Sequence, residues 1–99
     1  MKVPIRAYRI VEISMSCTFE LSFDSLLFDI LEELRMLEEL NESHGIIGIN
    51  IDDIGRMERL LKEAAKDYSE REVEAAERAI ARIRRELDPK WGYVLYRCY

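Results

Sequence analysis

The 99-residue sequence contains one histidine, two cysteines and no glutamine. It has no apolar run near the roughly 20 residues that span a bilayer. Its opening residues, MKVPIRAYR, include no continuous apolar segment typical of a signal peptide. We therefore expect no membrane association and no secretion, with the cytoplasm as the default location.

The scarcity of histidine and cysteine also limits the chemistry. Cys17 and Cys98 are too far apart in the sequence for the closely spaced pairs of a zinc site. They are either two small buried side chains or a disulfide that joins the first strand to the last. No serine or cysteine has a recognisable base nearby. We expect no cofactor, no metal and no catalytic residue, and we favour a non-enzymatic role.

His44 is the one histidine, and Asp53 lies close to it in the sequence. Together they form a candidate small-ligand site, in which His44 would act as a base or a metal ligand. The favoured alternative is structural. A histidine near the end of one helix and an aspartate at the start of the next both stabilise the helix dipoles.

The balance of charge is acidic, with a formal net charge of −5. Nucleic-acid affinity comes largely from Lys and Arg, so this balance disfavours nucleic acid as the main partner. Arginine outnumbers lysine eleven to four, which together with the missing glutamine is typical of thermophilic proteins.

Residues 11–23, VEISMSCTFELSF, alternate between apolar odd positions and polar even positions. This period predicts a strand with one buried face. Together with VPIRAYRI before it, the segment predicts one long bent strand with a bulge near Ile10–Val11. A hairpin near residues 14–16 is the alternative, but no Gly or Asn-Gly marks its turn. The even positions, including Thr18 and Glu20, are expected to face water, another subunit or a ligand.

Three segments have helical periodicity. The first is predicted to begin at an Asp24 cap and to end between residues 41 and 45, with Gly45 as a left-handed cap. The second begins at Asp52 or Asp53 and runs to Tyr68. The third begins at a capping box formed by Ser69 and Glu72, and it stops at residues 88–89, Asp-Pro.

Two β-branched or aromatic segments complete the chain, a buried strand around Ile46 to Ile51 and a last strand in residues 91–99. We therefore predict a single α+β domain over residues 1–99, built in two layers. Its small sheet comprises the long N-terminal strand, the short middle strand and the C-terminal strand. Three helices cover mainly one face of this sheet.

Four aromatic residues of the last strand are the candidate interface: Trp91, Tyr93, Tyr96 and Tyr99. Alternation directs Tyr96 to one face of the strand and the other three to the opposite face. Tyr and Trp are favoured in protein interfaces, and a long strand edge invites pairing. The leading hypothesis is therefore an interaction or assembly module with a protein partner, most simply a second copy in a homodimer.

The alternative is a nucleic-acid-binding module that uses Arg78, Arg82 and Arg85 on one side of the third helix, with the aromatic last strand. These arginines are interleaved with glutamates, so a solvated face with pairs such as Glu74–Arg78 and Arg82–Glu86 is favoured instead.

Residues 45–48, Gly-Ile-Ile-Gly, resemble the GXXG loop of KH nucleic-acid-binding domains. The resemblance implies contact with a sugar-phosphate backbone. Both middle residues are isoleucine and two aspartates follow, so a tight turn and a buried strand are favoured here.

Overall fold

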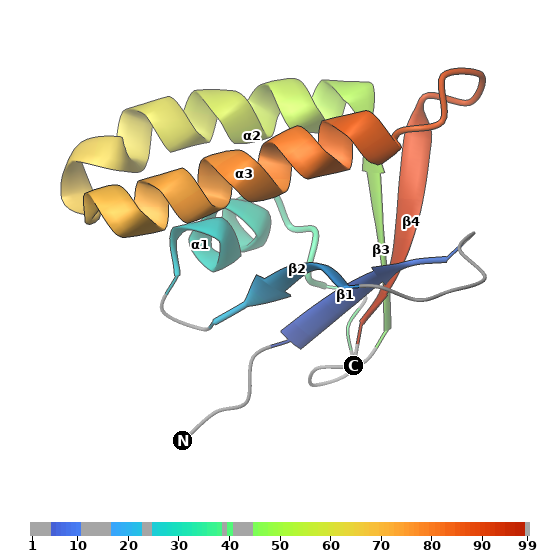
Figure 1. The fold of residues 1–99 in the computed structure, drawn as a ribbon, viewed down its shortest axis with the longest axis horizontal. Helices are drawn as coiled ribbons and strands as arrows, with labels where there is room; N and C mark the ends of the chain where they lie inside the picture. Colours follow the sequence, from blue (N-terminus) through green and yellow to red (C-terminus); the bar gives the residue numbers. More distant parts are fainter. Residues whose placement is uncertain (1–4, 11–16, 23–24, 39, 41–44, 99) are drawn as a thin grey trace.

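The computed structural model describes residues 5–10, 17–22, 25–38, 40 and 45–98. Within these ranges, the elements follow in the order β1 (Ile5–Arg9), β2 (Cys17–Leu21), α1 (Leu26–Glu33), β3 (Gly45–Asn50), α2 (Ile51–Ala64), the 3₁₀ turn η1 (Ala65–Asp67), α3 (Glu70–Glu86) and β4 (Tyr93–Cys98). Helices α2 and α3 lie side by side over one face of the sheet, with the short α1 beneath them (Figure 1). The predicted two-layer α+β architecture is confirmed.

The sheet has the strand order β2-β1-β4-β3, and each pair of neighbours is antiparallel. Strands β2 and β3 are therefore its two edges. The sheet twists strongly, so β1 and β2 cross the view at a steep angle to β3 and β4 (Figure 1). The core lies between the inner face of this sheet and the three helices.

The N-terminal segment forms two strands, so the prediction of one long bent strand is wrong. Ile5 pairs with Leu21 and Ala7 with Phe19, in antiparallel register. A single strand of this length would extend for about 50 Å, beyond any core that a chain of this size can build. Folding back lets both halves bury their apolar side under the same helices. The bulge predicted at Ile10–Val11 falls partly on residues 11–16, which lie outside the described ranges.

A register shift occurs in β2 instead. Ala7 pairs with Phe19 and Tyr8 with Cys17, which leaves Thr18 as an extra residue. An extra residue changes the alternation of faces. Thr18 is consequently 7% exposed, and the expectation that it faces water is wrong. Glu20 is exposed as predicted, and its carboxylate lies 3.5 Å from Arg6 on β1.

Helix α1 begins one residue later than predicted. Its N-cap is Ser25, whose hydroxyl accepts a hydrogen bond of 3.1 Å from the Phe28 amide. The predicted cap, Asp24, lies outside the described residues. A serine hydroxyl satisfies one of the free amides of the first turn in the same way as an aspartate.

Helix α1 also ends far earlier than predicted. Arg35 adopts a left-handed conformation with φ of 60°. The Arg35 amide donates to Glu32 O, and the Met36 amide donates to Leu31 O at 2.9 Å. This pair of bonds is a Schellman motif, which satisfies the last carbonyls and stops the helix. Gly45, the predicted cap, is instead the first residue of β3.

Helix α2 is capped by Asn50, two residues before Asp52 and three before Asp53, so the prediction that one of these aspartates is the cap is wrong. The Asp53 amide donates to Asn50 Oδ1 at 2.8 Å, and the Asn50 amide donates to Asp53 Oδ2 at 2.9 Å. Helix α3 is capped by Ser69, which accepts from the Glu72 amide, so that predicted start is confirmed.

Strand β4 alternates as the sequence predicts, with Val94, Tyr96 and Cys98 buried and Tyr93 exposed. The Tyr96 ring lies edge-on to Phe19, with ring centroids 5.2 Å apart. Because β4 is a central strand, its inward side chains meet residues from both halves of the chain. Tyr96 is therefore a core residue rather than a surface aromatic.

Candidate functional site

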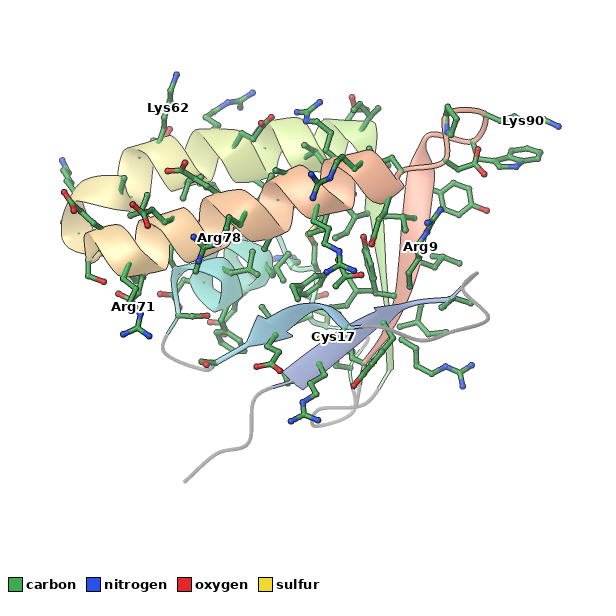
Figure 2. The ribbon with its side chains drawn as sticks, in the orientation of Figure 1. Arg9, Cys17, Lys62, Arg71, Arg78 and Lys90 are labelled. Atoms are coloured by element: carbon green, nitrogen blue, oxygen red, sulfur yellow. The ribbon has the colours of Figure 1, made fainter. Side chains whose placement is uncertain are left out.

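A concavity of about 950 Å³ lies between the edge strand β2, the start of α1 and helix α3. We call it the α3–β2 groove. Its α3 wall carries Arg71, Arg78, Arg82 and Arg85. Arg71 and Arg78 project from the side of α3 that faces away from α2 (Figure 2). The structure thus brings the three predicted arginines together and adds Arg71, which has the same helical phase.

The glutamates of α3 neutralise only part of this wall. Arg82 Nε lies 3.3 Å from Glu86 Oε2, as the sequence predicts. The predicted partner of Arg78, Glu74, forms no ion pair with it. Among the described residues, Arg71, Arg78 and Arg85 all lack an ion-pair partner. The groove therefore carries exposed positive charge on an otherwise acidic chain.

A partly buried polar cluster lies at the end of α3, centred on Glu86, whose side chain is 14% exposed. Its carboxylate accepts hydrogen bonds from the Thr18 hydroxyl at 2.9 Å and from the Tyr96 hydroxyl at 2.7 Å. With Arg82, these donors satisfy most of the capacity of the carboxylate. The cluster ties α3 to an edge strand and to a central strand of the sheet.

The Tyr96 hydroxyl is held in its neutral form. Burial, followed by the hydrogen bond to Glu86 and the negative charge of that carboxylate, raises the pKa of Tyr96 far above its ordinary value. The nearby charges of Arg9 and Arg82 lower it by less. Tyr96 is therefore a permanent donor to Glu86 and is unsuited to act as a base or nucleophile near neutral pH.

The second notable surface is the β3–β4 patch, at the β3 end of the sheet. Three of its residues lie on the strands, on the face away from the helices, while Ile51 begins α2 and Trp91 lies in the turn before β4. We define it by its large exposed apolar residues: Ile46, Ile51, Trp91, Tyr93 and Leu95. By the register of β3 and β4, Leu95 and Tyr93 lie opposite Gly48 and Asn50 on the same face as Ile46, whose own partner is the exposed Arg97. Within the described ranges, no other large apolar side chain is exposed.

Two of the four predicted interface aromatics belong to this patch. Trp91 is 64% exposed and lies beneath the Lys90 ammonium, 5.1 Å from its ring centroid. Tyr93 is also exposed, whereas Tyr96 is buried and Tyr99 lies outside the described residues.

The prediction of a buried strand around Ile46 to Ile51 is wrong at both ends, because β3 is an edge strand and leaves Ile46 45% exposed, while Ile51 begins α2 and is 51% exposed. Sequence reasoning did not single out Leu95.

The predicted nucleic-acid surface is divided in the structure. Tyr93 lies on the outer face of the sheet and Trp91 in the turn before β4, while the arginines lie in the α3–β2 groove on the helix side. They do not form one continuous surface. Gly45 and Gly48, which resemble a KH loop, both lie within strand β3.

The ligand site predicted near His44 falls on residues outside the described ranges. Asp53, its other member, takes part in the capping box at the start of helix α2. It accepts the Asn50 amide and lies 2.6 Å from the Arg56 guanidinium. The described half of this candidate site is therefore a capping arrangement.

Cys17 and Cys98 are both free thiols. They lie on the two strands that flank β1, about two strand spacings apart, or roughly 10 Å. A disulfide needs Cα atoms within about 7 Å. Burial, with a smaller effect from Cys17, raises the pKa of Cys98 to about 11. Burial also raises the pKa of Cys17, so both thiols are poor nucleophiles near neutral pH.

In the part of the chain that the structure describes, no group of three or more His, Cys, Asp or Glu residues is arranged to hold a metal ion. No helix there combines the length and the apolar character needed to cross a membrane.

Comparisons with protein-family models, curated proteins and solved structures found no match. The two surfaces of the chain itself are thus the basis for any functional proposal.

Proposed function

We propose that this chain is a non-enzymatic interaction module that forms a homodimer through the β3–β4 patch. One observation carries the proposal. Among the described residues, three of the large apolar side chains that remain exposed, Ile46, Tyr93 and Leu95, lie on the same outer face of the adjacent strands β3 and β4. Isolated apolar residues are normal on a protein surface, but a contiguous patch is typical of a surface that another protein covers.

The edge strand β3 supports pairing with a second chain. Its sequence, GIIGIN, has no charged residue and no proline. Such residues are the usual protection of an edge strand against pairing. The other edge, β2, is less accessible to a second whole sheet, because it carries the bulge at Thr18 and α3 lies against it, although the groove between them leaves room for a single chain. β3 is thus the less protected of the two edges.

A second copy suits this edge because of symmetry. Two β3 strands that pair antiparallel are related by a twofold axis, and each then meets the same residues of the other. Pairing of this kind would continue the antiparallel order of the sheet into the next chain. Ile46 and Leu95 of both copies would lose exposed surface, and Trp91 and Tyr93 would supply the amphipathic rings that interfaces favour.

Sedimentation velocity from micromolar to millimolar concentration tests the proposal. Ile46→Lys and Leu95→Lys place a charge in the patch at positions that are already 45% and 39% exposed, so both should fold. Gly55→Lys is the matched control, because it adds the same charge on α2 where the new side chain meets open space. We expect dimers for the wild type and Gly55→Lys, and monomers for the two patch variants.

Circular dichroism of each variant verifies the fold. A wild-type chain that remains monomeric at millimolar concentration contradicts the proposed dimer. A dimer that survives both patch substitutions shows that self-association uses another surface.

A further inference from the structure

The arginines of the α3–β2 groove form a regular row. Arg71, Arg78 and Arg85 are separated by intervals of seven residues, close to two helical turns, so they share one side of α3. The row extends for about 21 Å. Ala75 and Ala79 lie between them in the lining of the groove, where their short side chains leave space between the arginines.

The opposite wall of the groove is the open edge of β2. Phe19 is buried in the core and Glu20 is exposed, yet both line the groove. Neighbouring side chains of a strand point to opposite faces of the sheet. Because residues of both kinds line the groove, the groove runs along the edge of β2 rather than over one face. An edge strand has main-chain N–H and C=O groups without partners in its own sheet, to which extended peptides can pair.

We infer that the α3–β2 groove binds an acidic segment of a partner protein in an extended conformation. The main chain of the segment lies along β2, and its carboxylates meet Arg71, Arg78 and Arg85. A guanidinium group matches a carboxylate with two parallel hydrogen bonds. The 21 Å row corresponds to about six residues of an extended chain.

The lining of the groove favours a peptide over a nucleic acid. Glu20 and Glu72 interrupt the positive charge of the groove. Spaced carboxylates can avoid these positions, whereas a continuous phosphate backbone cannot. Bases also bind by stacking on exposed aromatic rings, and the one aromatic side chain in this lining, Phe19, is buried.

Fluorescence anisotropy of the full chain at low salt tests the inference. The probe is a fluorescein-labelled peptide of eight residues, slightly longer than the row, with alternating Glu and Thr so that the carboxylates share one side. Arg78→Gln and Arg85→Gln each remove a charge from an exposed position of the groove. Arg59→Gln is the matched control, because it removes an exposed arginine of α2 outside the groove.

We expect saturable binding that weakens with added salt. Each groove variant should bind about fivefold more weakly, and Arg59→Gln should bind as the wild type does. A peptide with Gln in place of Glu, and one with N-methylated main-chain amides, should both bind poorly. Ile46→Lys should bind normally, because β2 and β3 are opposite edges of the sheet, so this test is independent of the proposed dimer.

Three results would overturn the inference. The first is absence of peptide binding at low salt, where charge attraction is strongest. The second is equal binding by the wild type and both groove variants. The third is tighter binding of an oligothymidylate of similar length, which would show a preference for a phosphate backbone.

Discussion

The Thr18 hydroxyl donates a hydrogen bond of 2.9 Å to Glu86, which joins the bulge of an edge strand to the last turn of α3. The two residues are 68 positions apart in the sequence. The bond exists because the bulge turns Thr18 toward the helix layer, where Glu86 is held by two further donors. This contact fixes the position of α3 against β2 and therefore the shape of the groove between them.

Thr18→Val removes this hydroxyl while keeping the shape of the side chain. We expect it to lower the free energy of unfolding by about 1–2 kcal/mol, because a buried carboxylate loses one donor. Urea denaturation of the wild type and the variant measures this. Thr18→Ser keeps the hydroxyl and should lose less stability than Thr18→Val, and the reverse order would contradict the role assigned to the hydrogen bond.

Tyr96→Phe removes the other hydroxyl donor of Glu86 and should also destabilise by about 1–2 kcal/mol. The double variant with Thr18→Val leaves Arg82 as the remaining described donor to the carboxylate. We expect a loss larger than the sum of the two single losses, since both act on the same group. A double-mutant cycle in urea provides the measurement, and strict additivity would count against a shared cluster.

Arg35→Gly should stabilise the chain. Arg35 has φ of 60°, a conformation that is unfavourable for a side chain with Cβ and favourable for glycine. The expected gain is about 0.5–1 kcal/mol in thermal or urea denaturation. Arg35→Ala is the control, because it removes the exposed ion pair with Glu38 but keeps Cβ, and it should produce no gain. A loss of stability in Arg35→Gly would contradict the left-handed helix end.

Ionisation of the buried Cys98 thiol should lower the free energy of unfolding at alkaline pH. Its pKa rises from 9.0 to about 11 on folding, chiefly through burial. A raised pKa stabilises the folded state fully below pH 9, and this contribution is lost as the pH rises through about 11. The effect is on the order of 2 kcal/mol. Urea denaturation between these pH values should show a smaller fall for Cys98→Ala than for the wild type, and parallel curves would exclude the effect.

Local patterns in the sequence were sufficient to predict several elements of the fold. Ser69 begins α3 as predicted, since a serine followed three residues later by glutamate satisfies the first amides of a helix without help from other segments. The alternation of β4 correctly divides Tyr93 from Tyr96 because side chains of a strand point to opposite faces whatever covers them.

Other features depend on contacts between distant segments. Nothing near residue 35 in the sequence resembles a helix end, because the Schellman motif uses an arginine where glycine is usual. The downstream residues Met36, Leu37 and Leu40 retain apolar character because they pack on the core outside the helix. Their helical spacing therefore led to a prediction that was too long.

The sequence by itself determined the two-layer class of this protein, the start of α3 and the buried face of β4, because each follows from the spacing of apolar and capping residues within one segment. Only the tertiary structure decided that the N-terminal segment forms two antiparallel strands, β1 and β2, and that Thr18 faces inward. It also decided that Glu86 joins two strands to α3 and that one row of arginines lines a groove. The physical reason is that pairing between strands and packing between layers select among local conformations of similar energy, and that choice depends on residues far away in the chain.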